Sequence, residues 1–121
     1  MTVAYWVIAG LLALLYLFSG GSKVLRSREQ LQPMMNWVDD MPMPAVRAIG
    51  VAELLGAIGL ILPPLTGIAP ALALAAAIGL LLLQLAATAF HLSRGEKDNI
   101  GLNIGLVVVT GALIWLSTVW L

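Results

Sequence analysis

Six polar side chains lie inside or at the ends of long apolar runs, and they are the residues best placed for chemistry. They are Tyr16, Lys23, Glu53, Gln84, His91 and Asn103. The pairs Tyr16–Lys23 and Gln84–His91 are each seven residues apart, which puts both members on one face of a helix. Such side chains donate or accept hydrogen bonds, and Glu53 and His91 can also exchange protons with a bound molecule.

Glu53 is the most informative of these residues, because it is the one carboxylate in the apolar stretch from residue 48 to residue 92. It follows Arg47 by six residues, or about 9 Å along a helix, so it lies below the cytoplasmic headgroups. A carboxylate at that depth is either protonated or paired. Lys23, His91 and Asn103 fall at the same membrane level, and we predict that Lys23 reaches inward to Glu53.

Together the six residues predict a polar pocket in the inner half of a helical bundle, which is our candidate ligand site. Structural alternatives stay open. A Lys23–Glu53 pair could simply bind two helices, with Gln84 and Asn103 as interhelical hydrogen-bonding groups. His91 could snorkel to the interface at a helix end, and Tyr16 could be a core aromatic residue whose hydroxyl finds a neighbour.

The composition excludes several other kinds of site. The chain has no cysteine and one histidine, which rules out disulfides, thiol redox relays and thiolate metal sites, so we predict no metal site. Six basic and six acidic residues give a net charge of zero, and this balance gives no support to nucleic-acid binding.

The elements that must position these residues are membrane-spanning helices. The chain has 121 residues, of which 61% are hydrophobic and 10% charged, and its mean hydropathy is +1.03. A bilayer core needs about 20 apolar residues per helix. We predict an all-α, polytopic membrane four-helix bundle in one domain, residues 1–121, with spans near residues 3–21, 46–62, 69–92 and 99–119. Pro63, Pro64, Gly67 and Pro70 mark the tight turn between the second and third spans.

Charge and aromatic residues predict the orientation. The six basic residues all lie in or beside the first and third connections: Lys23, Arg26, Arg28, Arg47, Arg94 and Lys97. By the positive-inside rule these connections face the cytoplasm, and both termini lie on the outer side. Tyr5, Trp6, Trp115 and Trp120 then fall at the outer boundary as an aromatic belt.

The first connection, residues 22–45, carries apolar residues at helical spacing: Leu31, Met34, Met35, Val38 and Met41. This pattern predicts a short interfacial amphipathic helix, with Trp37 at headgroup depth. The alternative is a solvated loop with exposed methionines. Before the last span, Asp98 or Asn99 is expected to act as a helix N-cap.

Three segments in this order resemble the DoxX-like membrane proteins: FSGGSKVL, RAIGVAELLGAIGLILPP and ATAFHLSRGE. Gly20, Lys23, Gly50, Glu53, Gly56, Gly59, Pro63 and His91 occupy positions typical of that family. The resemblance implies a four-helix integral membrane protein of the bacterial cytoplasmic membrane. The family takes its name from a subunit linked to archaeal thiosulfate:quinone oxidoreduction, some relatives associate with membrane redox complexes, and distant ones act as assembly chaperones.

From the polar pocket and this resemblance we predict a site for a quinone or a similar lipophilic ligand, in contact with membrane redox proteins. Quinone is the one cofactor expected, and no catalytic residue is assigned. A non-enzymatic scaffold or assembly partner with a purely structural polar cluster is the alternative. A small transporter is a weaker alternative, because four helices enclose a pathway only if the chain forms a homo-oligomer.

Overall fold

The computed structural model describes residues 2–31, 33, 41–93, 95 and 100–121, and four long helices make up most of this part of the chain. They are α1 (Thr2–Leu25), α3 (Met43–Thr66), α4 (Leu72–Ser93) and α5 (Ile100–Ser117). Two short elements accompany them, α2 (Arg28–Leu31) and the 3-10 helix η2 (Thr118–Trp120). The four spans are long and apolar enough to cross a membrane, which confirms the predicted all-α membrane four-helix bundle.

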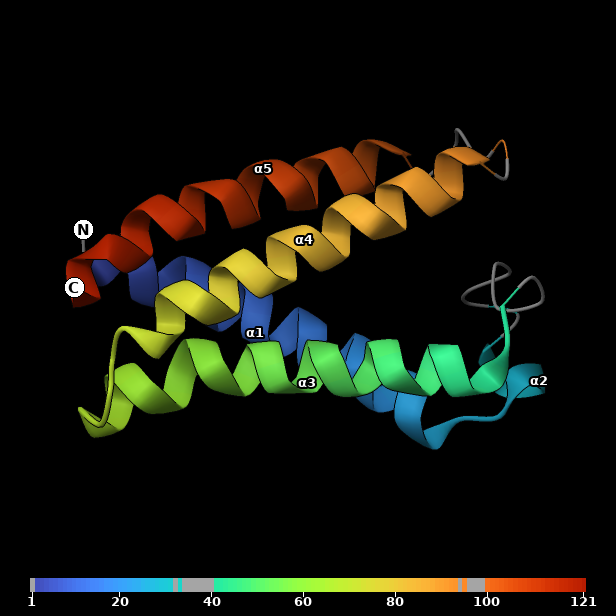
Figure 1. Cartoon of the computed structure of the whole chain (residues 1–121), viewed down its shortest axis with the longest axis horizontal. Coiled ribbons are helices and arrows are strands. Elements are labelled where there is room, and N and C mark those ends of the chain that lie inside the picture. The colour runs from blue at the N-terminus through green and yellow to red at the C-terminus, as the bar shows by residue number, and fades with distance from the viewer. Residues whose placement is uncertain (1, 32, 34–40, 94, 96–99) are drawn as a thin grey trace.

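The helices pack as two pairs, α1 with α3 and α4 with α5, and α3 and α4 join the pairs (Figure 1). Both termini and the α3–α4 turn lie at one end of the bundle, here named the termini end. The short helix α2 lies at the opposite end, the α2 end. From the termini end toward the α2 end, α4 diverges from α3, so the two pairs are farther apart where the predicted polar residues lie.

Glycines allow the closest approach between helices. A Cβ atom at Gly20 of α1 would lie 2.7 Å from the carbonyl oxygen of Gly50 on α3, and one at Gly50 would lie 2.8 Å from that of Gly20. Between α3 and α4, a Cβ at Gly56 would lie 2.5 Å from the side chain of Leu80. Small residues at such crossings let membrane helices approach closely, and the resulting van der Waals packing helps to associate helices in lipid.

The second long helix does not end at the prolines. Pro63 and Pro64 lie inside α3, which continues to Thr66, so the prediction that the turn begins at Pro63 is wrong. Gly67 ends the helix in the left-handed conformation, with φ of 74°, and its N–H donates to the carbonyl of Pro63 at 3.0 Å. The glycine, which adopts positive φ without steric cost, is the residue that stops this helix.

The Tyr5 hydroxyl of α1 supplies a hydrogen bond to a backbone carbonyl of α3 that has lost its helical donor because of Pro64. Pro64 has no N–H to donate to the carbonyl of Leu60, its normal partner one turn earlier. The Tyr5 hydroxyl of α1 donates to this oxygen instead, at 2.5 Å. Because an unsatisfied carbonyl is costly in lipid, this contact helps α3 to run through its prolines.

The part of the first connection that the structure describes is attached to the bundle. Leu31 at the end of α2 is buried against Val46 of α3, with Met41 and Met43 beside them. Arg28 donates to the Met41 carbonyl at 3.1 Å. The rest of the predicted interfacial helix, including Met34, Met35, Trp37 and Val38, lies outside the described residues, as do Asp98 and Asn99.

The outer surface is apolar, as lipid contact requires. Large side chains such as Leu14, Leu55 and Leu82 are more than 60% exposed although they lie in the middle of their helices. At the termini end, the rings of Tyr5, Trp6 and Trp120 pack edge to face, with centroids 5.3–5.8 Å apart.

Candidate functional site

A buried ion pair joins the first two long helices. The ammonium group of Lys23 on α1 donates to the carboxylate of Glu53 on α3, and the prediction that Lys23 reaches inward is confirmed. Lys23 is 8% exposed and Glu53 is 3% exposed. Lys23 also donates to the Ser19 hydroxyl one turn earlier, at 3.0 Å. Charged side chains this deeply buried persist only when they are paired and hydrogen-bonded.

The glycine crossing explains why the two charges meet. Gly20 and Gly50 contact each other, and each is followed three residues later by a charged side chain, Lys23 or Glu53. Because α1 and α3 run in opposite directions, Lys23 packs beside Gly50 and Glu53 packs beside Gly20. The long lysine side chain then extends along the interface toward the carboxylate, away from the α2 end.

A second polar cluster crosses the bundle. The Tyr16 hydroxyl of α1 donates to Oε1 of Gln84 on α4 at 3.5 Å, and Nε2 of Gln84 donates to Oδ1 of Asn103 on α5 at 3.1 Å. All three residues are buried. Tyr16 also lies close enough to Glu53 to interact with it electrostatically. The ion pair and this cluster therefore bring polar side chains of all four long helices into one region.

Thr110 of α5 adds a hydroxyl that the predicted site did not include. Its side chain is fully buried beside Tyr16, whose hydroxyl is its polar neighbour.

The sixth predicted residue, His91, is half-buried near the end of α4, where its ring centroid lies 6.1 Å from that of Phe90. The hydrogen bonds described above do not include it. Its role at the site stays a prediction.

Arg47 has a role that sequence reasoning missed. It was interpreted as a marker of orientation, but its guanidinium donates to the carbonyls of Lys23 and Arg26 at 2.6 and 2.5 Å. These carbonyls lie in the last turn of α1 and directly after it, where carbonyls lack helical partners and attract positive charge. A basic residue just inside the second helix of an antiparallel pair is the signal that could have indicated this cap.

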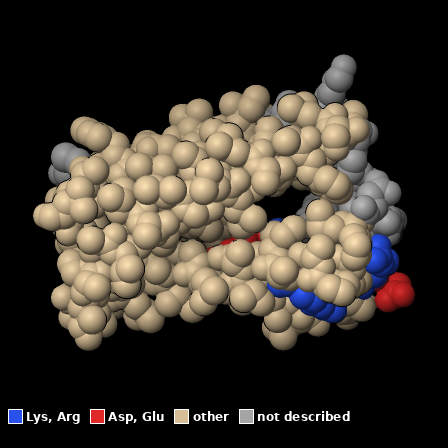
Figure 2. Space-filling view, viewed as in Figure 1, with Lys and Arg blue, Asp and Glu red and all other residues tan. Residues whose placement is uncertain are grey.

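The half of the bundle toward the α2 end has an opening between its helices (Figure 2). Figure 2 shows a deep opening between α3 and the α4–α5 pair, toward the α2 end, with acidic and basic atoms visible inside it. Of the charged residues that the structure describes, Lys23 and Glu53 are the buried ones. The other charged atoms in this view gather on the surface of the α2 end.

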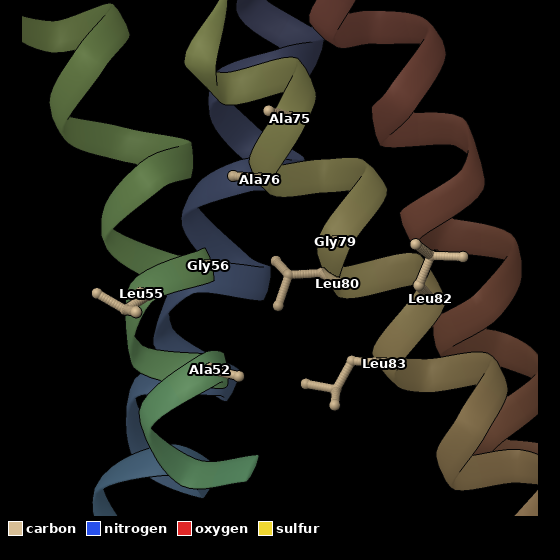
Figure 3. A pocket seen from close by; sticks show the side chains of 9 residues that line it. All are labelled: Ala52, Leu55, Gly56, Ala75, Ala76, Gly79, Leu80, Leu82 and Leu83. Atoms are coloured by element: carbon tan, nitrogen blue, oxygen red, sulfur yellow. The ribbon is translucent and has the colours of Figure 1, made fainter. Parts of the chain in front are cut away.

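An apolar groove runs beside this opening between α3 and α4, with a volume of about 640 Å³ (Figure 3). Leu80 and Leu83 point from α4 into the space between the helices, and Ala52 faces them from α3. The groove is open to the lipid side, since Leu55 and Leu82 on its rim are exposed. Toward the α2 end it finishes at Ala52 and Leu83, the sequence neighbours of Glu53 and Gln84.

The chemistry available is hydrogen bonding around one ion pair. Among the described residues, no three His, Cys, Asp or Glu side chains lie together. The groove between α3 and α4 is lined by apolar residues and lies beside the helices that carry Glu53 and Gln84.

The sequence matches the DoxX-like family over residues 7–115, a range that contains all six predicted site residues. No curated protein and no solved structure is significantly similar to the chain.

Proposed function

The chain belongs to the DoxX-like family, and from this premise we propose that it binds a lipophilic molecule with a small polar head group, such as a quinone, as part of a membrane redox system. The family match and the four apolar helices make it a small multi-pass membrane protein. Ligand binding is the function that the geometry supports best.

One observation carries the proposal: Figure 2 shows an opening between α3 and the α4–α5 pair, in the half of the bundle that holds its buried polar groups. An apolar groove of about 640 Å³ also lies between α3 and α4, with exposed Leu55 and Leu82 on its rim. An apolar tail in the groove would bring a head group toward Glu53 and Gln84 directly from the bilayer.

The test is to identify what the protein retains. Protein purified in mild detergent from native membranes would be extracted, and the small molecules identified by mass spectrometry. A Gly79→Leu variant fills the groove, since Gly79 lines it and a Cβ there meets no atom within 4 Å. Gly105→Leu is the matched control, because a Cβ at Gly105 also meets no atom, and that residue lies on α5 outside the groove.

We expect a stoichiometric quinone or related amphiphile with the wild type and with Gly105→Leu, and its loss with Gly79→Leu. Equal retention by the two variants would contradict binding in the groove. Recovery of bulk phospholipid alone from the wild type would contradict the function itself.

We further propose that the termini end faces outward across a bacterial cytoplasmic membrane. Four basic residues of the described chain lie at or near the α2 end, which supports this orientation: Lys23, Arg26, Arg28 and Arg47. Because the chain has no cysteine, single variants Thr2→Cys and Gln30→Cys can be labelled in intact cells with an impermeant maleimide. We expect labelling of Thr2→Cys and none of Gln30→Cys. The opposite result would show that the α2 end faces outward instead.

A second candidate, a scaffold or assembly partner, is favoured by the way the polar residues bond to one another. The Lys23–Glu53 pair and the Tyr16–Gln84–Asn103 cluster connect all four long helices. Under this function Glu53→Gln lowers stability while no small molecule is lost, and a protein partner co-purifies in stoichiometric amount. Under the ligand-binding function the same variant loses its ligand and still purifies as a folded bundle.

A further inference from the structure

The two halves of the α3–α4 interface are packed differently, although one pattern of side chains runs along both. We infer that α3 and α4 form a lateral gate, which is open in this structure and closes when the α4–α5 pair swings toward α1 and α3. This movement belongs to the helices themselves and does not depend on which molecule the groove binds.

Toward the termini end, α3 and α4 are in close contact. A Cβ at Gly59 would lie 2.8 Å from the Cβ of Ala76, and a Cβ at Gly56 would lie 2.5 Å from the side chain of Leu80. Beyond this crossing, toward the α2 end, α4 diverges from α3 (Figure 1). The crossing is therefore the point about which one helix can turn against the other.

The pattern that packs at the crossing continues into the open half. One helical turn beyond Gly56, α3 carries Ala52, and one turn beyond Leu80, α4 carries Leu83. Ala52 and Leu83 line the groove and face each other across it (Figure 3). Because small residues let membrane helices approach closely, Leu83 can pack on Ala52 much as Leu80 packs on Gly56. The open arrangement therefore leaves a preformed packing surface unused.

Each pair of helices is held together by its own polar contacts, so each pair can move as a unit. The ion pair of Lys23 and Glu53 joins α1 to α3. Gln84 donates to Asn103 at 3.1 Å and joins α4 to α5. The hydrogen bond from Tyr16 to Gln84 connects one pair to the other, and its length is 3.5 Å. A bond of that length is near the limit for hydrogen bonding, so it adds little to fix the spacing of the pairs.

The features that allow α3 and α4 to change their angle lie toward the termini end. Pro63 and Pro64 lie inside α3, and prolines interrupt the backbone hydrogen bonds of a helix and are common sites of bending. Gly67 ends α3 at the turn that leads to α4. The rings of Tyr5 and Trp120, with centroids 5.3 Å apart, hold α1 against η2 at this same end. The bundle is thus hinged at one end and open at the other, as in hinge closure of domains.

The experiment measures distances between spin labels in each half of the interface. Because the chain has no cysteine, pairs of exposed residues can be changed to cysteine and labelled without background. Val51→Cys with Leu85→Cys reports on the open half. Leu62→Cys with Leu72→Cys reports on the termini end. In nanodiscs of synthetic phosphatidylcholine, double electron–electron resonance should give two populations at least about 2 Å apart for the first pair, and one population for the second.

Adding bulk at Ala52 tests the packing that closes the gate. In Ala52→Leu the longer side chain fills the groove of the open state, so Leu83 can no longer approach, and the population with the shorter distance should disappear. Ala112→Leu is the matched control, because Ala112 is exposed on α5 and outside the groove, and it should keep both populations. An unchanged distance between labels at residues 62 and 72 shows that the bundle of each variant is intact.

The outcomes decide the inference by themselves. Two populations in the wild type and in Ala112→Leu, with one in Ala52→Leu, support the gate. A single population for the open half of the wild type overturns it, and so do two populations that persist in Ala52→Leu. Neither result bears on the proposed function, which the extraction of ligand from native membranes tests separately.

Discussion

Replacing Gly20 by alanine tests the helix crossing on which the ion pair depends. The added Cβ would lie 2.7 Å from the carbonyl oxygen of Gly50 and 3.2 Å from the Cβ of Glu53. Ordinary contact begins at 3.4 Å, so α1 and α3 would have to separate by about 0.7 Å at this point. The obstacle at Gly50 is backbone, which cannot rotate away as a side chain can, and overpacking of this kind costs about 1–3 kcal/mol.

The neighbouring glycine provides the control. A Cβ at Gly21 meets no atom within 4 Å, so Gly21→Ala changes the same helix by the same chemistry without a clash. Alanine favours helix formation over glycine by roughly 1 kcal/mol, and this gain is common to both variants. We therefore expect Gly20→Ala to be about 1–3 kcal/mol less stable than Gly21→Ala.

The assay is unfolding by sodium dodecyl sulfate in mixed micelles, followed by far-ultraviolet circular dichroism. Each variant would be compared with the wild type at several protein concentrations to exclude an effect of association. Equal transition midpoints for Gly20→Ala and Gly21→Ala would refute the close crossing of α1 and α3, and with it our account of why Lys23 meets Glu53.

Three further changes test contacts that hold the helices. Tyr5→Phe removes the hydroxyl that donates to the Leu60 carbonyl, so we expect a loss of about 1–3 kcal/mol in the same unfolding assay, and unchanged stability would contradict this role of the hydroxyl. Arg47→Met removes the cap at the end of α1, so amide hydrogen exchange should accelerate at residues 23–26 but not in α4; uniform acceleration would indicate general unfolding instead. Gly67→Ala puts a side chain at φ of 74° and should cost about 1–2 kcal/mol, whereas a neutral result would show that another residue ends α3.

The pairing at the centre of the bundle could be predicted from the sequence because lipid makes polar residues informative. Glu53 needs a partner at its own depth, and alternation of helix direction puts Lys23 at that depth. The ion pair confirms this reasoning. The same logic predicted that Gln84 and Asn103 would share a level, and they are hydrogen-bonded. Their role in binding a ligand stays a prediction.

Other features of the fold could not be predicted, because they depend on how two helices cross. The spacing of residues along one helix does not determine that crossing. The end of α3 was misplaced because proline is unfavourable in an isolated helix, whereas here Tyr5 of another helix supplies a donor near Pro64. The cap by Arg47 and the groove beside Leu80 likewise arise between helices. They depend on the angle between α3 and α4, and no periodicity in either segment encodes that angle.

The order of the ion pair along the chain has a consequence for biosynthesis. Lys23 leaves the ribosome thirty residues before Glu53, so the partner of the carboxylate is already in place when α3 enters the bilayer. A carboxylate near the middle of a span opposes insertion by about 2.5–3.5 kcal/mol. We therefore expect α1 and α3 to leave the translocon together as a hairpin. Site-specific crosslinking of arrested nascent chains would detect it, and integration of α3 with equal efficiency in a chain carrying Lys23→Met would argue against it.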